Sequence, residues 1–188
     1  MLLDSAVSSP GPHIPERLKN RLFPITTCVL RQGEISAFTL AFHALDLALA
    51  SDPSVPSGLW VNVLFVDRDS VTLNLDPGVL GNHLPLVIYP LHRWRERVLD
   101  SIRMMACALE ELCHHFWSIR DEMLVKDEVI ELIRLVFPRI ERSDIFDPNW
   151  SPDAGQCSAH LAAKTKSPRG LHTGHSRPAA CPPWTSIV

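Results

Sequence analysis

Residues 60–66 read WVNVLFV, a run of apolar and β-branched residues that is typical of a strand buried on both faces. Upstream, residues 34–50 read EISAFTLAFHALDLALA and repeat apolar residues at helical spacing, which predicts a helix with one buried stripe. That stripe consists of Ile35, Phe38, Phe42, Leu45 and Leu49. Asp52, Pro53, Pro56 and Gly58 break the chain between the two segments. A helix followed by a buried strand therefore forms the centre of the predicted fold.

The segment that follows this strand predicts a β-hairpin. Residues 67–70 read DRDS, which favours a turn, and residues 71–75 read VTLNL, with apolar and polar residues in alternation. Residues 84–89 read LPLVIY and predict a third short strand, which Pro90 ends. We therefore expect a small, partly antiparallel sheet.

Two helices are predicted after the strands. From residue 93 to about residue 119 apolar residues recur at helical spacing, with Val98 inside the buried stripe. Residues 118–121 predict a break, and a second helix follows from about residue 122 to 137, where Pro138 stops it. Helices packed on a small, partly antiparallel sheet make this an α+β fold.

The composition predicts one folded domain with loose ends. A chain of 188 residues with 46% apolar positions is long enough to bury a sizeable core. Residues 1–20 hold three prolines and small polar residues, which indicates a loose leader. Residues 147–188 are rich in proline and lack apolar periodicity, so we expect a disordered tail whose scattered histidines are incidental. The folded part is then residues 21–146.

Several classes of protein are disfavoured by composition. A net charge of -3 with scattered basic residues argues against a dedicated nucleic-acid binder. Five cysteines with no CxxC pair argue against a disulfide scaffold or a thiolate zinc site. No segment reaches about 18 uninterrupted apolar residues, and no secretory signal is visible, so we expect a cytoplasmic protein without a membrane partner.

The densest group of side chains able to bind a metal ion lies in the first of the two C-terminal helices. Glu110 and His114 are four residues apart, which places them on the same helix face. Glu111 lies about 100° around the helix, where it reaches a metal-bound water from the side. Glu122 opens the next helix in register with its apolar stripe, where a carboxylate is costly unless it is paired or metal-bound. We expect Glu122 to be the third ligand.

The segment ALEELCHHFW resembles the active-site helix of zincin-like metallopeptidases, whose motif is His-Glu-x-x-His. Residues 110–114 match it at the second and fifth positions, and glutamate replaces the first histidine. The resemblance implies a zincin-like core over residues 35–137 and a zinc ion held by Glu110, His114 and Glu122, with Glu111 as the general base. An oxygen-rich ligand set also suits manganese or iron. The implied function is a metal-dependent hydrolase, active or divergent and inactive, that acts on an extended peptide docked on the strand before the motif helix.

Other interpretations of the same residues stay open. The chain is alternatively a small interaction or regulatory protein without catalysis, in which Glu110 and Glu111 are a solvated helix edge. Cys113 is expected to pack in the core, because a nucleophile in mid-helix is poorly placed. His43 is expected to be a core histidine. A di-iron helix bundle is disfavoured because only one Glu-x-x-His pair is present and strands occupy the place of two helices.

Overall fold

The computed structural model describes residues 10–69 and 85–146 of the chain. In chain order its elements are η1 (Glu16–Leu18), β1 (Leu22–Thr26), α1 (Gln32–Ser51), β2 (Val61–Val66), β3 (Leu86–Pro90), α2 (Leu91–Glu96), α3 (Ser101–Phe116), α4 (Glu122–Arg134) and α5 (Arg142–Ile145). The predicted helix at 34–50 and strand at 60–66 are confirmed as α1 and β2. Helices together with a small sheet agree with the α+β class.

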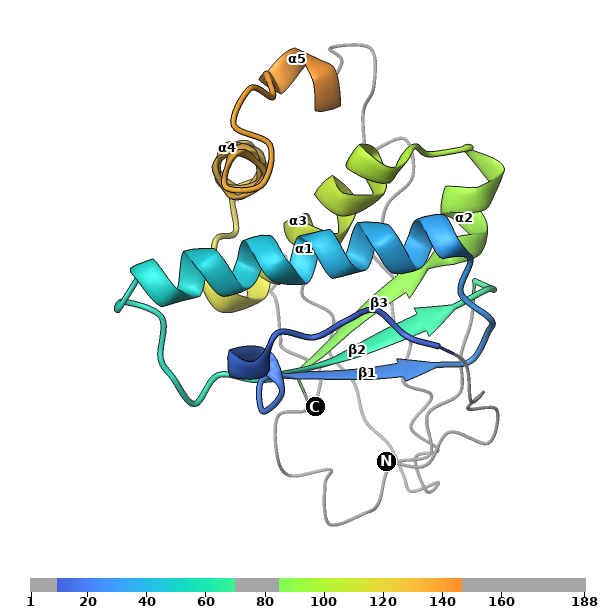
Figure 1. The fold of residues 1–188 in the computed structure, drawn as a ribbon, viewed down its shortest axis with the longest axis horizontal. Coiled ribbons are helices and arrows are strands. Elements are labelled where there is room, and N and C mark those ends of the chain that lie inside the picture. The colour runs from blue at the N-terminus through green and yellow to red at the C-terminus, as the bar shows by residue number, and fades with distance from the viewer. Residues whose placement is uncertain (1–9, 70–84, 147–188) are drawn as a thin grey trace, which may run out of the picture.

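The described strands form one sheet in the order β1-β2-β3, and both pairings are parallel. Leu22 lies opposite Val61 in the first pairing, and Asn62 lies opposite Leu86 in the second. Helices α1, α2, α3 and α4 lie on one side of this sheet (Figure 1). The prediction of a partly antiparallel sheet is therefore wrong for the described strands.

The predicted hairpin fails because β2 is the central strand. Its two hydrogen-bonding edges are taken by β1 and β3 along its length, which leaves no edge of β2 for a hairpin partner. The predicted partner strand, residues 71–75, lies outside the described residues. A run that is almost entirely apolar, such as β2, suits the centre of a parallel sheet better than a hairpin strand with one solvated face.

Strand β1 was not predicted, and Pro24 in its middle explains why. Proline is tolerated in a strand where its missing N–H would point away from the sheet. The Val61 N–H donates to the Arg21 carbonyl and the Thr27 N–H donates to the Phe65 carbonyl, so by alternation Pro24 points away from β2. The outer edge of β1 pairs with no other described strand, and Pro24 removes one of the donors along it.

The core is centred on Phe38 of α1. Its ring lies 4.6 Å from the ring of Phe65 on β2 and 4.9 Å from that of Tyr89 on β3, measured between centroids. The Trp94 ring of α2 stacks on it at 5.4 Å. Phe38 has no exposed surface. One side chain therefore joins a helix to two strands and to a second helix.

Helix α1 is also the one described helix that passes a length and hydropathy test for a membrane span. Its buried apolar residues belong to the same core cluster as residues of β2, β3 and α3. Packing in that core accounts for its apolar composition.

The predicted helix at 93–119 is two helices. Chain direction changes at residues 97–100, where Val98 has a φ of 51° and Asp100 caps α3 through a hydrogen bond from the Arg103 N–H. Val98 was expected in the buried stripe but is 85% exposed. The expected break at 118–121 is confirmed, since α3 ends at Phe116 and α4 begins at Glu122. Helix α4 ends at Arg134, three residues before the predicted end.

The loose leader that we expected over residues 1–20 includes residues that belong to the folded part. Leu18 of η1 is a member of the core cluster, and the Arg17 guanidinium forms an ion pair with Asp46 of α1 at 2.9 Å. Residues 10–20 thus pack against α1. Residues 1–9 and the predicted tail, 147–188, lie outside the described residues.

The position of Phe38 predicts its contribution to stability. Phe38→Ala should lower the free energy of unfolding by about 4 kcal/mol, because it removes a fully buried ring from contact with four other aromatic residues. Phe23→Ala, which removes a ring that is 41% exposed on the opposite face of the sheet, should cost about 1 kcal/mol. Urea denaturation followed by circular dichroism measures both. Equal losses would contradict the central role of Phe38.

The outward position of Pro24 predicts a change in self-association. Pro24→Thr restores an N–H to the open edge of β1, so it should increase concentration-dependent oligomerisation while lowering stability by less than about 1 kcal/mol. Light scattering coupled to size-exclusion chromatography measures the first effect. Pro53→Thr, in the turn after α1, is the matched control and should leave the protein as monodisperse as the wild type.

Candidate functional site

Helix α3 carries the predicted site and is fixed from two sides. It packs against α1 and α4, and the hydroxyl of Tyr89 on β3 donates a hydrogen bond of 2.7 Å to the Ala108 carbonyl. A carbonyl in mid-helix already accepts an intrahelical bond, so the Tyr89 contact adds a second one. This packing buries Leu109, Leu112 and Cys113 completely. The neighbouring polar positions of the helix are left at the margin of the core.

A tight turn joins α3 to α4 and brings the two helices together at His114. His114 Nδ1 lies 2.6 Å from the Ile119 carbonyl oxygen. Because a carbonyl oxygen only accepts, Nδ1 is the protonated ring nitrogen. The Asp121 carboxylate accepts hydrogen bonds from the Met123 and Leu124 N–H groups and starts α4. Glu122 then lies with its Oε1 atom 3.7 Å from His114 Nε2.

Glu110 and Glu111 lie half-buried beside this pair. Burial, followed by the charges of Glu111 and Glu122, raises the pKa of Glu110 to about 7. Burial raises the pKa of Glu111 to about 7 as well, where His114 opposes the shift and Glu122 adds to it. Within residues 10–69 and 85–146, neither carboxylate has a hydrogen bond or an ion pair of its own. Lys126 and His114 offset the shift of Glu110 only in part, so both carboxyl groups keep a proton to a higher pH than an ordinary glutamate does.

The four predicted residues thus lie together, but they do not form a complete ligand set. His114 and Glu122 face each other, and Glu110 and Glu111 feel their charges. In the described part of the chain, no three His, Cys, Asp or Glu side chains are gathered closely enough to hold a metal ion. The residues fit a metal ion as a pair of donors, and the three-ligand zinc site stays a prediction.

Three expectations about single residues are settled by burial. Glu122 was expected on the buried stripe of α4, but its side chain is 56% exposed, because the first turn of the helix extends past the core. His43 was expected in the core and is exposed on α1 instead. Cys113 is buried as expected, and burial raises the pKa of its thiol well above the usual value, so it is no nucleophile.

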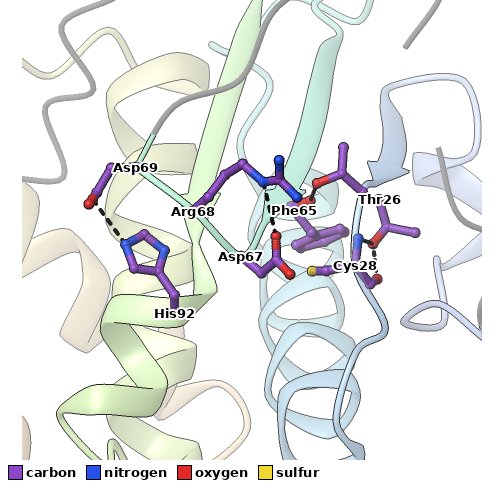
Figure 2. Close-up of polar contacts among 8 residues, drawn as sticks. Thr26, Cys28, Phe65, Asp67, Arg68, Asp69 and His92 are labelled. Carbon is purple, nitrogen blue, oxygen red and sulfur yellow. Dashed lines mark hydrogen bonds and ion pairs between the residues drawn. The ribbon is translucent and has the colours of Figure 1, made fainter. Parts of the chain in front are cut away.

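A second polar cluster, which sequence analysis missed, lies at the carboxyl ends of β2 and β3 (Figure 2). Asp69 Oδ1 accepts hydrogen bonds from His92 Nε2 at 2.9 Å and from the Arg93 guanidinium at 2.6 Å. Hydrogen bonds from Arg93 and His92 hold the pKa of Asp69 below its usual value. The sequence does carry a signal for this cluster, because Asp-Arg-Asp follows one predicted strand and His-Arg follows the next. Residues 67–70 were interpreted only as a turn.

The second cluster has a structural role, because its charged groups bind one another. Asp69 accepts from two donors and ties the end of β2 to the start of α2. His92 Nδ1 is buried and has no hydrogen-bond partner, so it is not open to an approaching ligand. The carboxyl edge of a parallel sheet is the usual place for ligands in α/β proteins, yet here its charges are bound to each other.

A buried ion pair completes that edge. Glu34, in the first turn of α1, is 2% exposed and accepts a hydrogen bond of 2.6 Å from Arg95 of α2. Burial alone would raise the pKa of Glu34, but hydrogen bonds from Arg95 and from the Arg31 N–H hold it below the usual value. Glu34 therefore stays ionised and joins α1 to α2.

Comparisons with protein-family models, with curated proteins and with solved structures find no match to this chain. The zincin-like resemblance therefore rests on the motif in residues 110–114 and on the side chains described above.

The raised pKa of Glu110 predicts a pH-dependent stability. The folded state keeps a proton that the unfolded chain releases above about pH 5, so the free energy of unfolding should fall as the pH rises from about 5 to 8. Glu110→Gln should remove part of this slope and stabilise the protein at pH 8 by about 2 kcal/mol. Thermal and urea unfolding at pH 5 and pH 8 test it. Glu96→Gln, at an exposed position of α2, should leave the slope unchanged.

Proposed function

We propose that the chain binds a divalent metal ion where α3 meets α4 and acts as a metal-dependent hydrolase of the zincin-like kind. The observation that carries the proposal is the arrangement of His114. Its Nδ1 is occupied by the Ile119 carbonyl, and its Nε2 faces the Glu122 carboxylate at 3.7 Å. When neutral, His114 therefore turns a lone pair toward a negative oxygen.

Two facing electron-pair donors favour a cation between them. At 3.7 Å the two atoms are too far apart for a hydrogen bond. Two donors on one tetrahedral zinc ion lie about 3.4 Å apart, a few tenths of an ångström less than the observed separation. A histidine that donates its other ring N–H to a carbonyl is also the usual arrangement of a metal ligand. Zinc is the first choice, and manganese or iron(II) suits the oxygen-rich set.

Glu110 is the proposed third ligand, because it lies one helical turn before His114 and its carboxyl group is largely buried, which raises its pKa to about 7. The metal ion, when bound, would supply Lewis-acid activation of water. Glu111 is the proposed general base, because it lies next to Glu110 on α3, where its carboxylate would accept a proton from a water on the ion. The reaction class and the roles of Glu110 and Glu111 come from the zincin-like resemblance.

The proposed substrate is an extended peptide or protein segment. Strand β3 is an outer strand of the described sheet and lies next to α3. Because the Asn62 N–H donates to the Pro85 carbonyl, alternation turns the backbone groups of Leu86 and Ile88 away from β2. Those groups suit a peptide added as a further strand beside the proposed site.

A non-catalytic interaction protein is the second candidate, and one observation favours it. Phe23 and Trp60 pack edge to face at 5.8 Å and remain 41% and 38% exposed. Phe23 is the second residue of β1, and Trp60 directly precedes β2. Since the preceding residue Leu22 is buried in the core, alternation along β1 turns Phe23 to the face opposite the helices. Parallel sheets are normally covered on both faces, and exposed aromatic residues are enriched where proteins bind partners.

Metal binding separates the two candidates. Isothermal titration of the purified full chain with zinc, manganese and iron(II) should give about one ion bound per chain and a higher unfolding temperature with metal. His114→Ala and Glu122→Ala should each weaken binding at least about tenfold. Glu111→Gln should retain the metal and abolish hydrolysis of peptide substrates, because a general base does not coordinate the ion.

His43→Ala is the matched control, since it removes an exposed histidine from α1 and should leave the affinity unchanged. The metal site would be contradicted if the wild type bound no metal at millimolar concentration and Glu122→Ala were neutral or stabilising. The interaction protein would then be the remaining candidate.

A further inference from the structure

Two described residues other than glycine have a left-handed backbone: Val98 and Ser118. The left-handed region is costly for residues that carry a Cβ atom, so its occupation points to a local requirement. Ser118 has a φ of 54° and an exposed side chain, for which the described residues offer no hydrogen bond. The feature of Ser118 that matters to the structure is therefore its backbone conformation and not its hydroxyl.

The end of α3 is held in place just before Ser118. The Trp117 N–H closes the last helical turn on the Cys113 carbonyl at 3.1 Å. The Trp117 indole N–H donates to the Asp52 carboxylate, at the end of α1, at 2.8 Å. With Trp117 anchored to another helix, the direction of the chain after it depends on the backbone of Ser118.

The left-handed turn sends the chain back along the last turn of α3. As a result the Ile119 carbonyl oxygen lies 2.6 Å from His114 Nδ1, five residues earlier in sequence. A right-handed Ser118 would continue the helix, and the Ile119 carbonyl would then point along the helix axis, away from His114. The contact to His114 thus depends on the conformation of one residue.

We propose that Ser118 is a positioning residue whose left-handed backbone aims the Ile119 carbonyl at His114 and fixes the proton of His114 on Nδ1. The lone pair on Nε2 then faces Glu122, since the hydrogen bond at one ring nitrogen decides which form the other takes. The consequence for metal affinity rests on the proposed function, whereas the position of the proton does not.

The proposal predicts which residues can replace Ser118. Glycine adopts the left-handed region freely, so Ser118→Gly should keep the proton on Nδ1 and keep the zinc affinity. Valine is β-branched and strongly disfavoured there, so Ser118→Val should release the Ile119 carbonyl, give a mixture of the two forms of His114 and weaken zinc binding about tenfold. Ser118→Ala, with a smaller penalty, should give an intermediate result if Ser118→Val does not fold.

The measurement is long-range proton–nitrogen NMR on the metal-free full chain labelled with ¹⁵N-histidine, at a pH where His114 is neutral. His114→Ala assigns the signal. Val98→Gly is the matched control, because it relieves the other left-handed residue and should raise stability without changing the His114 signal. Zinc titrations of the same variants follow.

Two outcomes would overturn the positioning role: a wild-type His114 with its proton on Nε2, or a folded Ser118→Val that keeps the proton on Nδ1 as firmly as the wild type does. If the NMR pattern appears as expected but no variant binds zinc, the positioning role is supported and the proposed function is overturned. The two failures are therefore distinguishable.

Discussion

The packing of Phe38 against the sheet is the interaction on which the rest of the molecule depends. A parallel pair of strands needs a crossing element between them, and α1 provides it for β1 and β2. Phe38 fixes that helix on the sheet through Phe65 and Tyr89, and it fixes α2 through Trp94. These rings come from α1, from β2 and from the contiguous β3 and α2, so the core becomes stable only when all four elements are in place.

The geometry of the proposed site depends on contacts with this core. Tyr89 is part of the Phe38 cluster and also bonds the Ala108 carbonyl, so the sheet sets the position of α3. Asp52, at the end of α1, holds the Trp117 indole and sets the point at which α3 ends. His114 is thus placed by contacts made before and after it on α3, and its ring is oriented by the turn at Ser118.

The buried carboxylates of this chain are of two kinds, one paired with a cation and the other without an ion pair among the described residues. Glu34 is almost fully buried and fully paired, since Arg95 and the Arg31 N–H lower its pKa and bind α1 to α2. Glu110 and Glu111 are partly buried without a paired cation, and their pKa values rise to about 7. Groups with such perturbed pKa values are commoner at binding and catalytic sites than in purely structural positions, and the positive charge of a metal ion bound there would lower both pKa values.

The sequence by itself determined the elements with a strong local pattern. Apolar periodicity located α1, α4 and the break at 118–121, and a nearly continuous apolar run located β2. It also placed Glu110 and His114 on one helix face, because helical spacing is a local property. Only the tertiary structure decided the pairing of the strands, the role of β1 despite Pro24, and the exposure of Val98, His43 and Glu122. These features depend on which distant segment lies alongside, and a local pattern carries no information about that neighbour.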